Sequence, residues 1–247
     1  MKNEDYQIFG IRAIIEAINA GKTLDKVFIQ KGLKGDLIKE LETLIRKNGI
    51  GFSYVPIEKL NRLTRGNHQG VVASISPIAF YELEELVEKV LANENKVPLF
   101  LLLDQLSDVR NFGAIIRTAE CTGVDGIIIQ KKGAAPVTAD TIKTSAGAAF
   151  KVPIAKVNHL KDAVFYLQAS GIKVISATEK TENTIYDVSL KEPSAIVMGS
   201  EDVGITPSIL KASDATAKLP LLGEIGSLNV SVACGVFLYE AVRQRLN

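Results

Sequence analysis

The stretch LFLLLDQLSDVRNFGAIIRTAECTGVDGIIIQ, residues 99–130, decides the fold that the sequence predicts. It opens with an apolar run, LFLLLD, continues through the helix-like segment NFGAIIRTAECTG and closes with a second apolar run, DGIIIQ. Strand, helix and strand in this order predict a βαβ unit with parallel strands. Further strand-like runs, KVPIAKV, KVISATE, AIVMGS and ATAKLPL, alternate with helical segments. We therefore expect an α/β domain with about five or six parallel strands and helices on both faces of the sheet.

The first part of the chain predicts a smaller, separate α/β module. Apolar residues recur at helical spacing from Ile8 to Ala20 and again from Leu37 to Ile45, and VFIQ, FSYVP and VVASIS are strand-like. Residues 77–97 carry acidic charge and a weak helical period, which is typical of a connecting segment. The expected organisation is a module over 1–76, a linker over 77–97 and a sheet domain over 98–247.

The composition excludes several classes of protein. The 247 residues are 47% hydrophobic and 23% charged with a formal net charge of +1, which argues against a disordered or globally basic chain. Any nucleic acid would therefore bind at a local basic patch. Cys121 and Cys234 lie in apolar helical contexts without metal-ligand spacing, so we expect buried free thiols, no metal and a reducing compartment. No signal sequence occurs and no apolar run approaches the ~20 residues of a membrane span, which favours a cytoplasmic protein.

The usual fingerprints of α/β enzymes are missing. The loop QLSDVRNFG that follows LFLLLD offers one glycine, where a dinucleotide-binding loop needs several, and no GxxxxGK[ST] phosphate loop occurs. The patterns HExxH and GxSxG and clusters of Cys and His are absent too. Metal catalysis, triad hydrolysis and dehydrogenase chemistry therefore have little support.

Polar residues nevertheless follow three of the predicted strands, where loops on a rigid sheet most often bind or react. Asn111 lies at a predicted helix start, and Arg117 lies about two turns further along. Glu201 follows a second strand, and Ser227 and Asn229 open the last helix after a glycine-rich turn. The residues alone leave ordinary alternatives open, because Ser and Asn cap helices and a lone Arg or Glu can simply be solvated.

Taken together, these segments resemble the three motifs of the SpoU (TrmH-like) branch of the SPOUT RNA 2′-O-methyltransferases. NFGAIIRTAECTGVDGIII is similar to the first motif, IVMGSEDVGI to the second and LPLLGEIGSLNVSVACGVFLYEAVRQR to the third. YQIFGIRAIIEAI and NHQGVVA resemble the small RNA-substrate-binding domain of the RlmB-type branch, which methylates a guanosine ribose in large-subunit ribosomal RNA. The sequence departs from the pattern at Val109, where many relatives have proline.

The resemblance implies a C-terminal SPOUT domain with a deep trefoil knot, S-adenosylmethionine bound in the knot, and a homodimer that acts on RNA. It implies that backbone groups at Gly199, Leu219 and Leu228 bind the cofactor. It also implies catalytic roles for a set of five polar residues, which comprises Asn111, Arg117, Glu201, Ser227 and Asn229. A guanidinium stays protonated in proteins and is a poor base, so we expect Arg117 to clamp phosphate and ribose.

The best candidate for an RNA contact is the segment 59–76, which contains no acidic residue. Its predicted contacts are Lys59, Arg62, Arg65 and His68, since clustered cations supply the sequence-independent part of RNA affinity. A merely solvated loop is the alternative. Two other functions stay open, namely the same chemistry on tRNA and an RNA-binding ribosome-assembly factor without catalysis. The N-terminal module argues against tRNA, and the polar set argues against an inactive factor.

Overall fold

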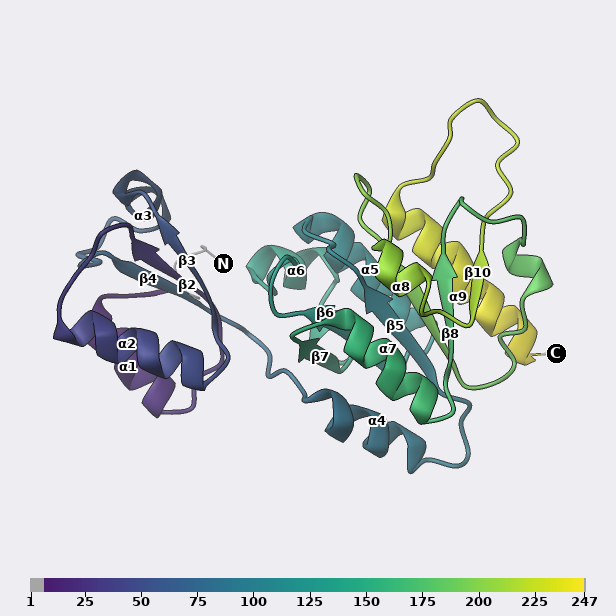
Figure 1. Cartoon of the computed structure of the whole chain (residues 1–247), viewed down its shortest axis with the longest axis horizontal. Coiled ribbons are helices and arrows are strands. Elements are labelled where there is room, and N and C mark those ends of the chain that lie inside the picture. The colour runs from purple at the N-terminus through teal and green to yellow at the C-terminus, as the bar shows by residue number, and fades with distance from the viewer. Residues whose placement is uncertain (1–6, 247) are drawn as a thin grey trace. The chain divides into compact units, whose positions relative to one another are not determined.

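The computed structural model describes residues 7–246, which form two compact units (Figure 1). The N-terminal unit contains β1 (Gln7–Phe9), α1 (Ile11–Asn19), β2 (Leu24–Gln30), α2 (Asp36–Lys47), β3 (Gly51–Val55), α3 (Ile57–Leu63) and β4 (Val71–Ile75). The C-terminal unit contains α4 (Leu83–Leu91), β5 (Leu99–Leu103), α5 (Val109–Cys121), β6 (Gly126–Gln130), α6 (Ala139–Thr144), β7 (Ile154–Val157), α7 (Leu160–Ala169), β8 (Lys173–Ala177), β9 (Ser194–Met198), α8 (Pro207–Leu210), β10 (Ala215–Ala217) and α9 (Val230–Leu246). Short 3-10 helices span Ala148–Phe150 and Ile185–Asp187.

The N-terminal unit is a four-stranded sheet in the order β1-β4-β2-β3. Strand β4 is antiparallel to β1 and β2, whereas β3 runs parallel to β2. Helices α1 and α2 pack on one face through residues such as Ile14 and Leu41, and α3 covers part of the other through Leu60. The sequence pattern missed β1 and α3, because elements this short do not complete enough periods to be recognised.

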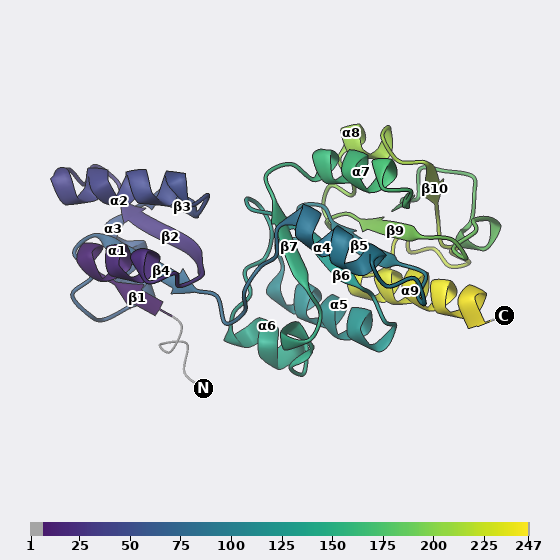
Figure 2. The same cartoon turned by 90° about the horizontal axis from the view of Figure 1, so that it is seen from below.

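The C-terminal unit is a six-stranded parallel sheet in the order β10-β8-β9-β5-β6-β7. Helices α4, α7 and α8 cover one face, and α5 and α9 cover the other (Figure 2). The predicted βαβ unit over residues 99–130 is confirmed as β5, α5 and β6. Strand β5 is buried along its whole length, as an unbroken apolar run in the middle of a parallel sheet requires.

The last predicted strand is shorter than the sequence suggests. Strand β10 ends at Ala217, and residues 219–229 form a long loop, yellow-green in Figure 1, so the strand-like run ATAKLPL does not continue as a strand to Leu221. Helix α9 leaves one side exposed, with Val232, Val236 and Tyr239 in one stripe. Because the sheet covers only one side of α9, a helix that is apolar on both sides must expose apolar surface.

The two cysteines lie in different environments. Cys121 is exposed at the last residue of α5, so the prediction that it is buried was wrong. Cys234 is buried in α9, and burial raises the pKa of its thiol to about 12. Within residues 7–246, no three His, Cys, Asp or Glu side chains gather as metal ligands, and every helix is too short or too polar to cross a membrane.

Arg245 anchors the end of α9 to the edge of the sheet. Its guanidinium donates hydrogen bonds to the backbone oxygens of Val97 (2.9 Å), Pro98 (3.1 Å), Leu190 (2.8 Å) and Glu192 (3.0 Å). Burial lowers the pKa of this guanidinium, but the side chain still donates to four backbone carbonyl groups of the segments that lead into β5 and β9. Helix α9 is therefore held at both ends, here by Arg245 and at its start by the site residues.

Candidate functional site

Three of the predicted site residues meet at the carboxyl edge of the parallel sheet. Asn229, directly before α9, donates from Nδ2 to Oε1 of Glu201 at 2.6 Å and to Oδ1 of Asn111 at 3.1 Å. These residues follow β10, β9 and β5, respectively, so the parallel arrangement brings together positions up to 118 residues apart. We call Asn111, Glu201 and Asn229 the polar cluster.

Asn229 is a helix cap and a member of the polar cluster at the same time. Its Oδ1 accepts hydrogen bonds from the backbone N–H groups of Ser231 (3.0 Å) and Val232 (3.4 Å), as an N-cap residue does. Glu201 Oε1 also accepts from the N–H of Val230 at 3.3 Å, where the helix dipole favours a negative charge. All the polar groups of the Asn229 side chain are thus occupied, which makes it a positioning residue.

The other two members of the polar cluster keep unused hydrogen-bonding groups. Asp108, not Asn111, caps α5, because its carboxylate accepts from the N–H of Asn111 at 2.7 Å. This leaves Nδ2 of Asn111 and Oε2 of Glu201 without a hydrogen-bond partner among residues 7–246. The polar cluster therefore offers one amide donor group and one carboxylate acceptor to a bound molecule.

A tight loop after β9 presents Glu201 to the polar cluster. The N–H of Gly204 donates to the backbone carbonyl oxygen of Ser200 at 3.0 Å. Gly204 has a φ of +73°, which favours glycine. A Cβ on Gly199 would lie 2.2 Å from the carbonyl carbon of Gly204, so only glycine fits. Buried Asp104 accepts from the N–H of Thr206 at 2.7 Å and anchors the end of the loop. Sequence reasoning missed Asp104, although a carboxylate that ends an apolar strand is a usable signal.

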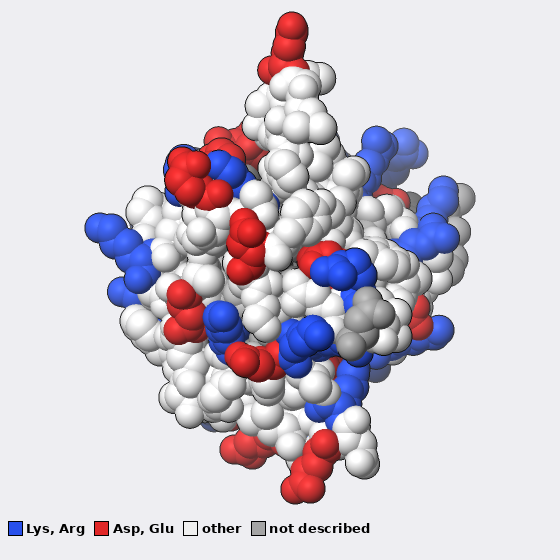
Figure 3. All heavy atoms as spheres, turned by 90° about the vertical axis from the view of Figure 1, so that its right-hand side faces the viewer, with Lys and Arg blue, Asp and Glu red and all other residues white. Residues whose placement is uncertain are grey.

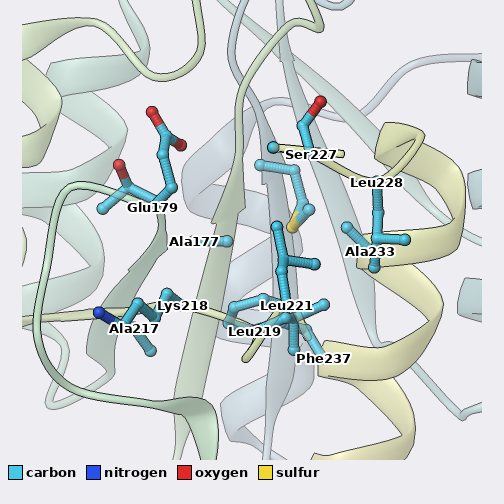
Figure 4. A pocket seen from close by; sticks show the side chains of 13 residues that line it. Ala177, Glu179, Ala217, Lys218, Leu219, Leu221, Ser227, Leu228, Ala233 and Phe237 are labelled. Atoms are coloured by element: carbon cyan, nitrogen blue, oxygen red, sulfur yellow. The ribbon is translucent and has the colours of Figure 1, made fainter. Parts of the chain in front are cut away.

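Two adjoining pockets lie beside the polar cluster at the ends of β8, β9 and β10. The apolar pocket, of about 130 Å³, is walled by Ala177, Met198, Ala217, Leu219 and Phe237 (Figure 4). The polar pocket, of about 590 Å³, is lined by the loop from Gly199 to Gly204 and by Asn229. Residues that line both include Glu179, Ser227 and Leu228. All three predicted cofactor-binding residues, Gly199, Leu219 and Leu228, therefore lie on pocket walls.

Like Ser227, the predicted catalytic residue Arg117 makes no hydrogen bond to the polar cluster. It is exposed on α5 and makes no hydrogen bond or ion pair within the described part of the chain. Its guanidinium is therefore available to a bound molecule, but nothing orients it. It lies six positions beyond Asn111 on α5, which places the two about 120° apart around the helix.

The predicted RNA contacts divide into exposed and buried residues. Lys59 and Arg62 are exposed one turn apart on α3, and Arg65 is exposed in the turn that follows. His68 is buried, with Nδ1 accepting from the N–H of Gly70 at 3.0 Å and Nε2 donating to Oδ1 of Asn61 at 2.9 Å. The prediction that His68 contacts RNA is therefore corrected, because both ring nitrogens are used to hold the turn before β4.

A fourth exposed cation joins this surface. The Nζ atoms of Lys26 and Lys59 lie 5.5 Å and 5.0 Å from the centroid of the Phe28 ring. A cation over a ring keeps its charge, so Phe28 holds two ammonium groups near each other without neutralising either. We call Lys26, Lys59, Arg62 and Arg65 the basic surface. Sequence reasoning missed Lys26, because Lys26 lies on β2 and comes near Lys59 only where α3 packs against that face of the sheet.

Comparisons with known proteins find RNA methyltransferase relatives along almost the whole chain. Residues 98–239 match the model of the SpoU rRNA Methylase family, and residues 7–81 match the model for RNA 2′-O ribose methyltransferase substrate binding. Bacillus subtilis YacO, described as a TrmH family tRNA/rRNA methyltransferase, is 34% identical over 99% of this chain and 97% of its own.

Two solved structures differ in how much of the chain they match. The SpoU methyltransferase AviRb from Streptomyces viridochromogenes, also solved with the cofactor AdoMet, has a TM-score of 0.60 and 25% identity, covering 98% of this chain and 90% of its own. The TrmH/SpoU tRNA modifying enzyme of A. aeolicus has a TM-score of 0.56 and 27% identity, covering 66% of this chain and 84% of its own.

The close approach at Gly199 predicts the effect of one added methyl group. Gly199→Ala should lower the free energy of unfolding by about 1–3 kcal/mol, because the Cβ would overlap the backbone of Gly204. Chemical denaturation followed by circular dichroism measures this change. Gly226→Ala is the matched control, since a Cβ there meets nothing within 4 Å. Equal stability of the two variants would contradict the loop geometry.

Proposed function

Since the chain belongs to the SpoU rRNA Methylase family of RNA methyltransferases, we propose that its reaction is methylation of a ribose 2′-hydroxyl of RNA. The preferred target is a guanosine of large-subunit ribosomal RNA. The observation that carries the proposal is the polar cluster, in which Glu201 keeps an unused carboxylate oxygen and, with Asn229, lines a pocket at the carboxyl ends of β8 and β9. Ligands of open α/β sheets bind at such strand ends.

The family uses S-adenosylmethionine, and the pockets fit this cofactor chemically. The apolar pocket offers Ala177, Met198 and Phe237 to a flat adenine ring, and the polar pocket can take the methionine part. No phosphate has to be held, which explains why a glycine-rich phosphate loop is unnecessary. We propose that Gly199, Leu219 and Leu228 hold the cofactor from the pocket walls.

The bound cofactor supplies a methyl group on a positively charged sulfur, and the residues of this chain position the oxygen that receives it. Oε2 of Glu201 accepts a hydrogen bond from the ribose 2′-hydroxyl, while Asn229 keeps the carboxylate in place. Arg117 binds the neighbouring phosphate and stabilises the negative charge that develops on the 2′-oxygen. Ser227 supports the loop that closes the pocket. Alignment of the reacting atoms contributes most of the rate enhancement in such a displacement.

The N-terminal unit supports ribosomal RNA as the substrate. It matches a substrate-binding model, whereas the similarity to the tRNA modifying enzyme of A. aeolicus covers only 66% of this chain. The basic surface gives this unit fixed positive charges for a phosphate backbone. By contrast, acidic and basic side chains are interspersed on the face of the C-terminal unit seen in Figure 3.

Two further features belong to this proposal. We propose that the chain around the pocket is threaded as a trefoil knot, and that two copies of the C-terminal unit pair through α9. The exposed stripe of Val232, Val236 and Tyr239 supports pairing, because a soluble protein seldom leaves neighbouring apolar side chains of one helix uncovered. A second copy of the chain presents the same stripe and is self-complementary about a twofold axis.

Methyl transfer tests the reaction and the substrate together. Labelled methyl from S-adenosylmethionine should enter one 2′-O-methylated guanosine in unmodified large-subunit rRNA. Arg117→Ala and Glu201→Ala should each lower kcat by roughly 100-fold, since each removes a group that acts on the reacting oxygen. Arg117→Lys keeps the positive charge but removes the forked hydrogen-bond donors, so its activity shows which of the two properties the reaction needs. Glu85→Ala, which changes an exposed carboxylate on α4 that lines neither pocket, should retain activity.

Other outcomes of this assay would overturn parts of the proposal. Label that enters only tRNA would reject the ribosomal target, and label on a base would reject the ribose chemistry. Cofactor binding without transfer to either RNA would direct the search to an assembling ribosomal particle. An absence of cofactor binding would favour an assembly factor without catalysis.

Fluorescence anisotropy with labelled RNA tests the basic surface. The double change Lys26→Ala with Lys59→Ala should weaken binding and should lower the slope of log affinity against log salt by about 1.4, since each lost phosphate contact to single-stranded RNA removes about 0.7. Lys39→Ala is the matched control, because Lys39 is an exposed lysine of the same unit that lies on α2 and pairs with Asp36. An unchanged slope in the double variant would remove this surface from the RNA path.

Light scattering tests the proposed dimer. The wild-type chain should have twice the 26.7 kDa mass of one copy, and Val236→Glu should reduce the mass to one copy because a buried unpaired carboxylate is costly. Phe165→Glu changes an exposed apolar residue on α7, which lies on the other face of the sheet, and should leave the dimer intact. A monomeric wild-type protein would contradict the pairing.

A further inference from the structure

Glu179 is an acidic residue of the pocket that the proposed chemistry does not use. It lies two residues beyond the end of β8, lines both the apolar and the polar pocket, and is exposed. Its carboxylate has no hydrogen bond or ion pair among residues 7–246. The lysine that lines the apolar pocket, Lys218, is already paired with Glu182 at 3.3 Å. Glu179 is therefore a free acceptor at the pocket rather than half of a structural ion pair.

The two pockets determine which part of the cofactor meets Glu179. Adenine is the flat, apolar end of the molecule, so it belongs in the apolar pocket beside Phe237. The methyl group must reach Glu201 and Asn229, which line the polar pocket. The ribose joins the adenine to the sulfur and must cross the boundary between the pockets. Glu179 is the acidic residue that lines both sides of that boundary, and Figure 4 shows it and Ser227 at the same end of the apolar pocket.

We propose that Glu179 binds the ribose of S-adenosylmethionine, with the 2′- and 3′-hydroxyls of the cofactor donating hydrogen bonds to its carboxylate. Two adjacent hydroxyl donors match the two oxygens of one carboxylate, and acidic residues recognise ribose hydroxyls in other α/β nucleotide sites for the same reason. Glu179 is thus a cofactor-binding residue and takes no part in the proton chemistry. The inference rests on the proposed use of S-adenosylmethionine but not on the identity of the RNA.

Isothermal titration calorimetry with two ligands tests this role without relying on activity. S-Adenosylhomocysteine contains the complete adenosine and amino-acid parts, whereas 5′-methylthioadenosine keeps the adenosine and lacks the amino acid. Glu179→Gln should weaken both ligands by the same factor, roughly tenfold, because charge-assisted hydrogen bonds to the shared ribose are lost. Glu182→Gln, which alters an exposed carboxylate in the same loop, should bind both ligands like the wild type.

Each alternative result has a separate meaning. Weaker binding of S-adenosylhomocysteine alone would show that Glu179 contacts the methionine ammonium and would overturn the proposal. Wild-type affinity of Glu179→Gln for both ligands would also overturn it while leaving the proposed function intact. Failure of the wild-type protein to bind either ligand would instead reject the cofactor assignment itself. Equal melting temperatures of the variants and the wild type would show that the affinities compare folded proteins.

Discussion

The side chain of Asn229 is the constraint on which the site depends. One amide caps the last helix through Oδ1 and holds Glu201 and Asn111 through Nδ2. The start of a helix has free N–H groups that must find acceptors, and here the acceptor is the residue that aligns the polar cluster. The hydrogen bonds of Asn229 therefore both cap the start of α9 and hold the polar cluster together. A substitution at Asn229 would disturb stability and activity together.

The parallel sheet supplies the geometry that this side chain requires. Strands β5 and β9 pair along their full length, so their carboxyl ends deliver Asn111 and Glu201 to one edge. The loop between Gly199 and Thr206 is held by a glycine contact at one end and by buried Asp104 at the other. This loop forms part of the wall of the polar pocket, and the sequence has no phosphate-binding glycine motif. The arrangement suits a cofactor that carries an adenosine but no phosphate.

Site residues could be predicted from the sequence where they belong to a family motif that follows the end of a strand. Asn111, Glu201 and Asn229 were found in this way, and the structure brings them together. Residues whose importance depends on a neighbour distant in sequence were missed. Lys26 becomes part of a charged surface only because α3 packs on the N-terminal sheet and brings Lys59 near it.

Burial accounts for the remaining differences between prediction and structure. Cys121 was expected to be buried and is exposed, and His68 was expected to contact RNA and is buried, because the local pattern does not show which side of a short element the rest of the fold covers. The same holds for the exposed stripe of α9. A helix apolar on both sides reads as a core helix, although only one side packs on the sheet.

The sequence by itself determined the α/β class, the parallel order implied by the βαβ unit and the identity of the motif residues. These follow from local periodicity and from short segments that need no knowledge of distant parts. Only the tertiary structure decided that Asn229 links two other strand ends, that Asp104 anchors the Glu201 loop and that Glu179 lines both pockets. Such facts depend on distances between residues far apart in the chain, and those distances exist only after the strands have paired.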